Sequence, residues 1–160
     1  MSKIIPTVIG KRGEQRFITA LMERGCSVFV PIVDVGIDVI AEAPFTKQPP
    51  RYFAFQVKTS TLSNKSNNWY WYVNVTGFRL SKMVYYIFVF DDTKNISRET
   101  KNRDNNFNAL IISSQDLEKE FRKQGRWRNG YEGNISITPS SLANGRTKWL
   151  KYLNRWDSIK

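Results

Sequence analysis

The segment "RYFAFQVKTS", residues Arg51–Ser60, has the pattern of a β-strand whose two faces differ in chemistry. Side chains alternate between the faces of a strand, so Phe53 and Phe55 share an apolar face. The opposite face ends in Gln56 and Lys58. An amide and an amine two residues apart on one face predict that this end of the strand contributes polar groups to a site.

The length and composition of the chain predict one domain. Its 160 residues, 41% of them hydrophobic, can form one substantial core and are too few for two comfortable ones. We therefore expect a single domain over residues 1–160. No run of about 18 apolar residues occurs, and the amino terminus becomes polar too early for a signal peptide. The expectation is a cytoplasmic protein without a membrane partner.

The side chains that the sequence lacks exclude several classes of enzyme. Cys26 is the single cysteine, so no internal disulfide can form, and there is no histidine. Without histidine, the common zinc frameworks, the Ser-His-Asp and Cys-His hydrolases and the histidine-based nucleases cannot be assembled. A metal in this protein must therefore be held by oxygen atoms.

The charge of the chain favours a polyanionic partner. It has 25 Lys and Arg against 14 Asp and Glu, a net charge of +11. Such a charge favours nucleic acid first and an anionic membrane surface second, although basic proteins without either partner exist.

Hydrophobic periodicity predicts alternating helices and strands along the chain. We expect a helix over 10–25, strands over 26–34, 36–43, 51–60, 69–75 and 85–91, and a strand followed by a helix over 109–123. The strand over 85–91 is apolar almost throughout, which is typical of a central strand covered on both faces. Ser113 and Asp116 are spaced as an N-cap and its partner. We expect residues 92–107 to form an exposed, mobile loop and residues 147–160 to form a last helix.

Four polar residues interrupt the apolar pattern of successive elements. Glu14 lies on the buried stripe of the first helix, Asp38 lies inside the second strand, and Gln56 and Lys58 lie on the third. Strands joined by a short connection are usually neighbours, so Asp38 is expected beside Gln56 with the helix packed over them. Carboxylate and amide oxygens suit Mg²⁺ or Mn²⁺. Lys58, about 7 Å from Gln56 along the strand, would then reach metal-bound water or a phosphate.

Each of these residues also has a simpler structural explanation. Glu14 would complement the positive end of its helix, and Asp38 could cap a turn. Gln56 could bond a strand edge, and Lys58 could extend its amine to solvent. The functional interpretation depends on all four residues occurring together in this order.

The order of these residues resembles the PD-(D/E)xK nuclease superfamily, in "GEQRF" with Glu14, "GIDVIA" with Asp38 and "QVK" with Gln56 and Lys58. It is most similar to the Holliday-junction resolvase-like branch and to the Gln-x-Lys form of certain transposase endonuclease subunits. The resemblance covers residues 10–91. It implies a restriction-endonuclease-like α/β fold, a mixed central sheet flanked by helices, and a Mg²⁺-dependent deoxyribonuclease. Asp38, Gln56 and the main chain of Val57 would hold the metal.

Two positions depart from the superfamily pattern. Ile37 stands where a proline is usual, and Gln56 stands where a carboxylate is usual. The second difference removes one negative charge from the metal site. The resemblance favours DNA over RNA, a choice that the composition does not make, and implies structure-selective cleavage. The oligomeric state, including a homodimer, stays open.

The carboxy-terminal quarter, residues 121–160, carries nine Lys and Arg against two acids. Such a segment can bind phosphates while its aromatic rings stack on bases or sugars. The residues predicted to contact nucleic acid are Arg122, Lys123, Arg126, Trp127, Arg128, Lys148 and Lys151. Trp149 and Trp156 are assigned instead to the core beneath the last helix.

Two other functions are compatible with the sequence. A non-catalytic nucleic-acid-binding protein could keep the fold and lose the chemistry through Gln56. An interaction protein or toxin-like effector could use the basic face to bind an acidic partner. Metal-dependent cleavage distinguishes the nuclease from both.

Overall fold

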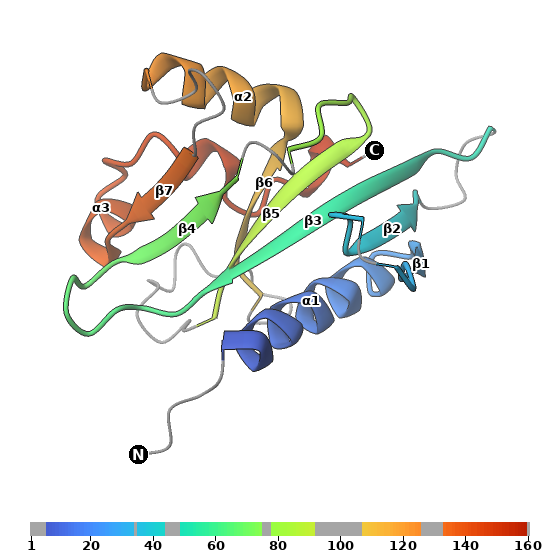
Figure 1. Ribbon diagram of the computed structural model, residues 1–160, viewed down its shortest axis with the longest axis horizontal. Coiled ribbons are helices and arrows are strands. Elements are labelled where there is room, and N and C mark those ends of the chain that lie inside the picture. Colours follow the sequence, from blue (N-terminus) through green and yellow to red (C-terminus); the bar gives the residue numbers. More distant parts are fainter. Residues whose placement is uncertain are drawn as a thin grey trace.

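The computed structural model describes residues 6–33, 35–43, 49–74, 78–91, 107–125 and 133–159. Its centre is a five-stranded mixed sheet in the order β1-β2-β3-β5-β6 (Figure 1). The strands are β1 (Ser27–Phe29), β2 (Val39–Glu42), β3 (Tyr52–Ser60), β5 (Val84–Phe90) and β6 (Ala109–Ser113). β3 and β5 pair in parallel, and the other neighbours are antiparallel. The predicted α/β class with a mixed sheet is therefore confirmed.

One face of the sheet is covered by the helix α1 (Pro6–Met22). Phe17 and Leu21 are buried, and the ring of Phe17 lies 5.0 Å from that of Phe55 on β3. The helix begins earlier and ends earlier than the predicted range 10–25. It ends before Gly25, whose φ of 79° is a left-handed conformation that glycine adopts at little cost.

The other face is covered by a second sheet and the helix α2 (Ser114–Lys123). β4 (Trp69–Val73) and β7 (Gly133–Ile137) pair antiparallel, and Trp69 and Trp71 pack on Phe90 of β5. All seven residues of β5 are buried between the two cores, as predicted for a central strand. The Ser113 side chain accepts from the backbone N–H of Asp116, which confirms the predicted cap of α2.

Three expectations for the secondary structure were wrong, and two elements were not predicted. Only Ser27–Phe29 of the predicted strand 26–34 is a strand, because Pro31 has no N–H for a ladder and the next described residues bend. Residues 147–159 form two 3₁₀ turns, Leu150–Tyr152 and Trp156–Ser158, in place of an α-helix. β7 and the short helix α3 (Pro139–Ala143) were not predicted. Phe107, placed in an exposed loop, is buried; the rest of that loop, 92–106, lies outside the described residues.

The carboxy-terminal segment reaches both cores. Trp149 and Tyr152 are buried on the side of α2, whereas Ile159 is buried on the side of α1, with Trp156 packed beside it. Between these residues the chain crosses the outer edge of β6, where the N–H of Asn154 donates to the carbonyl of Ala109. Both tryptophans therefore belong to the core, as predicted.

Within the described part of the chain, no helix has the length and apolar character that crossing a membrane requires.

Candidate functional site

Asp38 is fixed against the edge of β3. It lies directly before β2, one residue outside the strand in which it was predicted, after a turn at Gly36 with a φ of 73°. Its backbone N–H donates to the carbonyl of Phe55 over 2.9 Å, and its Oδ2 accepts from the N–H of Val57 over 2.7 Å. These two bonds hold the carboxylate beside the middle of β3.

Gln56 and Lys58 lie on the same side of the sheet as Asp38. Val39 pairs with Phe55, and both are buried on the α1 side. When this register is continued by one residue, Asp38 lies across from Gln56. Because side chains alternate along a strand, both lie on the side of the sheet that faces away from α1. Lys58 follows two residues later, and both side chains are half-buried. The structure thus brings together Asp38, Gln56 and Lys58, as the sequence predicted.

Burial and mutual charge shift the ionisation of this group. Partial burial raises the pKa of Asp38; the hydrogen bond from Val57 opposes this shift, the negative charge of Glu14 adds to it, and Lys58 opposes it. Burial lowers the pKa of Lys58, against the attraction of Asp38. A half-buried carboxylate and a half-buried amine near each other are typical of functional sites.

Glu14 approaches the site from a different direction than expected. Its helix covers the face of β3 that carries Phe55, whereas Gln56 and Lys58 lie on the other face. The helix is therefore not packed over Gln56, although the charge of Glu14 reaches Asp38. Lys11 contacts the Glu14 carboxylate at 2.6 Å.

A close contact between α1 and β3 determines how near Glu14 comes to the strand. A Cβ at Gly13 would lie 1.8 Å from Oγ1 of Thr59, so no larger residue fits without a shift. Gly13 is buried, and the absence of its side chain lets the helix backbone approach β3. Glu14, the next residue, is thereby held at the edge near Asp38.

The donors at the site are hard oxygen atoms. No group of three His, Cys, Asp or Glu side chains suited to a metal occurs among the described residues. The available donors are the Asp38 carboxylate and the Gln56 amide. The N–H of Val57 faces Asp38, and its carbonyl points to the same edge of the strand, because both groups of a strand residue share one edge. This set, near a second carboxylate, fits Mg²⁺ or Mn²⁺ with several waters retained.

Sequence reasoning missed Arg79, which holds the chain that leads to Asp38. Its guanidinium donates to the carbonyl of Val35 through Nε and Nη2, at 3.0 and 2.5 Å, and fixes the chain three residues before Asp38. Its backbone N–H donates to the hydroxyl of Tyr86, the residue in register with Gln56. A lone arginine outside any strand gave no signal in the sequence.

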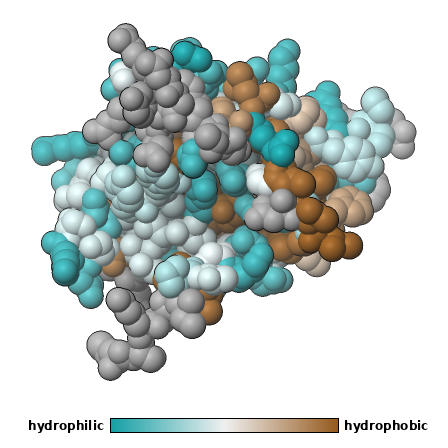
Figure 2. Space-filling model, viewed as in Figure 1, coloured by the Kyte–Doolittle hydropathy of each residue, from teal (hydrophilic) through white to brown (hydrophobic). Residues whose placement is uncertain are grey.

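An exposed apolar patch borders the same turn. Its members are Phe29, Val30, Ile32, Val33 and Val35. Figure 2 shows a hydrophobic area on the side of the molecule where β1 and β2 lie in Figure 1.

Several of the predicted nucleic-acid contacts gather around one buried carboxylate. Glu120 of α2 has a side chain only 7% exposed, and it contacts the amines of Lys151, Lys148 and Lys123 at 2.9, 3.4 and 3.7 Å. Arg122 instead contacts Glu118 on the same helix. Three lysines around one carboxylate leave a local charge of about +2. Arg126, Trp127 and Arg128 lie outside the described residues.

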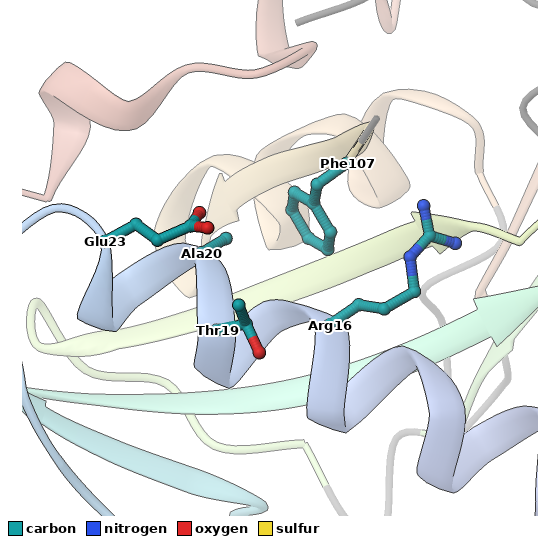
Figure 3. A pocket seen from close by; sticks show the side chains of 5 residues that line it. All are labelled: Arg16, Thr19, Ala20, Glu23 and Phe107. Carbon is teal, nitrogen blue, oxygen red and sulfur yellow. The ribbon is translucent and has the colours of Figure 1, made fainter. Parts of the chain in front are cut away.

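A cavity of about 180 Å³ opens elsewhere, between α1 and Phe107. Arg16, Thr19, Ala20 and Glu23 line the rest of it, and Figure 3 shows them along one side of α1. None of the four predicted catalytic residues lines this cavity, so it is not part of the candidate site.

Comparisons with known proteins identify the fold. No family model matches the sequence, and no curated protein matches it significantly. The structure is similar to that of a bacterial homing endonuclease, I-Ssp6803I, with a TM-score of 0.60 and 14% identity over 96% of this chain and 91% of that one. It also matches Hjc, a Holliday junction resolvase from Archaeoglobus fulgidus, with a TM-score of 0.43 and 12% identity over 84% of this chain and 95% of that one. The match to the homing endonuclease shows that this chain shares its fold, a mixed sheet flanked by helices.

Proposed function

We propose that this protein is a metal-dependent endonuclease that hydrolyses DNA phosphodiester bonds. The observation that carries the proposal is the placement of Asp38, Gln56 and Lys58 on one side of β3, in a nuclease fold. The net charge of +11 supports a polyanionic substrate. The resemblance of the motifs favours DNA as the substrate and branched DNA among its forms.

Each residue of the candidate site has its own proposed role in the reaction. Asp38, Gln56 and the carbonyl of Val57 would hold Mg²⁺ or Mn²⁺, and Glu14 would add negative charge at the same edge. The metal supplies an activated water and charge stabilisation for the phosphate. Lys58 carries a half-buried amine that can stabilise negative charge on the scissile phosphate or orient the attacking water. Lys148, Lys151 and Lys123 would bind phosphates away from the reacting bond, as would Arg122, Arg126 and Arg128. Trp127 would stack on a base or a sugar.

A second candidate function is favoured by Gln56. An amide in place of a carboxylate leaves Asp38 as the sole acid among the three proposed ligands. A site with one charge fewer binds Mg²⁺ less tightly, so a non-catalytic nucleic-acid-binding protein with this fold is the alternative.

A cleavage assay on linear duplex, branched and single-stranded DNA, with Mg²⁺, Mn²⁺ or chelator, tests the proposal. Metal-dependent cleavage that is lost in Asp38→Asn supports the endonuclease, and preference for the branched substrate supports structure-selective cutting. Salt-sensitive binding without cleavage by either metal would favour the non-catalytic alternative. The absence of both would overturn the two functions together.

A further inference from the structure

The small sheet formed by β4 and β7 has an outer face that the proposed nuclease site does not use. Burial alternates along β4, with Trp69, Trp71 and Val73 buried and Tyr70 and Tyr72 exposed. In β7, Ser136 is paired with Tyr70 and Asn134 with Tyr72. These four residues, Tyr70, Tyr72, Asn134 and Ser136, form what we name the tyrosine face.

The two tyrosines are unusually open for large aromatic residues. Tyr70 is 50% exposed and Tyr72 is 41% exposed. Tyr70 and Tyr72 are two residues apart on one strand, so their Cα atoms are about 7 Å apart. Successive bases of an extended single strand can stack on rings so spaced. None of the four residues of the tyrosine face is charged.

The backbone beneath the tyrosine face is held rigidly. Gly133, Ile135 and Ile137 are buried on the inner side of β7, as the two tryptophans are on β4. A Cβ at Gly133 would lie 2.3 Å from the ring of Phe121, so the sheet is pressed closely onto α2. The N–H of Tyr70 donates to the Ser60 hydroxyl, which fixes β4 to the end of β3. The rings are therefore presented by an ordered strand, which lowers the entropy lost on binding.

Polar groups suited to sugars and phosphates surround the rings. The amide of Asn68 donates to the Ser136 hydroxyl over 2.7 Å at one end of the face. Lys65 is exposed in the preceding turn, which the bond from the N–H of Ser63 to the carbonyl of Asn68 closes. Tyr, Asn, Ser and Lys are side chains that contact sugar and phosphate groups in nucleic-acid complexes.

We propose that the tyrosine face binds single-stranded nucleic acid, with bases stacked on Tyr70 and Tyr72 and the backbone near Lys65. Stacking on exposed rings tolerates any sequence, because every base has a π-face. The net charge of +11 attracts a polyanion to the protein, and the two exposed rings favour a polyanion that carries flat bases. The proposal goes beyond the cleavage reaction and does not require it, because binding here needs no metal.

Fluorescence anisotropy tests the proposal with a labelled single strand of about 16 nucleotides, in chelator, at fixed salt. Tyr70→Ala and Tyr72→Ala should each weaken binding by about fivefold or more, and the double variant by more than either. Tyr70→Phe should bind nearly as the parent, because it keeps the ring. Tyr52→Ala is the matched control, since Tyr52 is 48% exposed on β3, away from this face, and should leave the affinity unchanged.

The outcomes separate this proposal from its alternatives. Unchanged affinity in the double variant would overturn it, as would an equal loss with Tyr52→Ala. If the double variant lost as much affinity for a duplex of the same length as for the single strand, the tyrosines would contact the backbone rather than stack on bases. That result would overturn the proposal as well. A parent dimer that dissociates in the double variant would assign the face to self-association instead. Binding to this face is measured in chelator, whereas cleavage is measured with Mg²⁺ or Mn²⁺, so failure of the nuclease and failure of this face are distinguishable.

Discussion

The main-chain N–H of Val57 donates a hydrogen bond to Oδ2 of Asp38 over 2.7 Å. The strand that carries Gln56 and Lys58 thus also orients the carboxylate proposed to bind the metal. This bond joins Asp38 to the strand segment around Val57, which lies 19 residues later in the chain. The position of Asp38 relative to Gln56 and Lys58 therefore follows from the pairing of β2 with β3 and does not depend on a flexible loop.

Asp38→Asn should abolish metal binding and leave the fold intact. The amide oxygen of asparagine can still accept from Val57, whereas the charge that attracts the metal is gone. We expect a melting temperature close to the parent value and a cleavage rate lower by about 10² or more. Calorimetric titration with Mn²⁺ measures the loss of metal binding directly. Parental Mn²⁺ affinity in this variant would place the metal elsewhere.

Lys58→Met should remove catalysis without weakening the protein. Methionine keeps much of the apolar stem and removes an amine whose burial lowers its pKa. We expect DNA affinity within a few fold of the parent and a cleavage rate lower by about 10², as for the loss of a preorganised charge. The matched control is Lys119→Met on the exposed side of α2. Equal rates for Lys58→Met and the parent would show that Lys58 has no part in the reaction.

Gln56→Glu should strengthen metal binding by restoring the usual carboxylate. Two neighbouring carboxylates repel each other when no cation is present, so the metal-free variant should melt at a lower temperature than the parent. Adding Mg²⁺ should raise its melting temperature by more than it raises that of the parent. A smaller rise in the variant would argue against Gln56 as a ligand.

Gly13→Ala should destabilise the protein by about 1–3 kcal/mol, because the new methyl group collides with Thr59 and overpacks the contact between α1 and β3. Gly10→Ala is the control, since nothing lies within 4 Å of a Cβ there. It should stabilise the helix by about 0.5–1 kcal/mol. The double variant Gly13→Ala/Thr59→Ala should recover part of the stability that Gly13→Ala loses. Chemical denaturation of the four chains measures these differences, and equal effects at both glycines would contradict the close approach.

Glu120 should make the stability of the protein sensitive to acid. Its burial opposes ionisation, but the contacts with Lys151 and Lys148 outweigh it and lower the pKa of Glu120. A carboxyl group with a lowered folded pKa contributes stability above its unfolded pKa and loses it as the pH falls. The difference in unfolding free energy between the parent and Glu120→Gln should therefore shrink from pH 7 toward about pH 3. A difference that stays constant with pH would show that the three lysines do not stabilise the ionised carboxylate.

The sequence predicted the order of the elements from α1 to α2, because hydrophobic periodicity distinguishes helices from strands. It also predicted the juxtaposition of Asp38 and Gln56, because strands joined by a short connection are usually neighbours. It did not predict the side from which Glu14 approaches, since the face on which a helix packs depends on contacts such as Gly13 with Thr59. Helical spacing of Trp149, Leu153 and Trp156 was misleading. Those side chains pack against two cores on opposite faces of the sheet, an arrangement that one straight helix cannot make. β7 was missed because its pairing with β4 joins residues that are 60 to 68 positions apart.

The way residues 149–159 cross from one face of the sheet to the other has a consequence for biosynthesis. Neither core is complete until this segment has been added, because Trp149 and Tyr152 close one and Ile159 closes the other. A nascent chain still lacking these residues would expose the outer edge of β6 and apolar surface on both faces. Final packing must therefore wait until Ile159 has left the ribosome, and a chain interrupted before that point should be a substrate for proteases and chaperones.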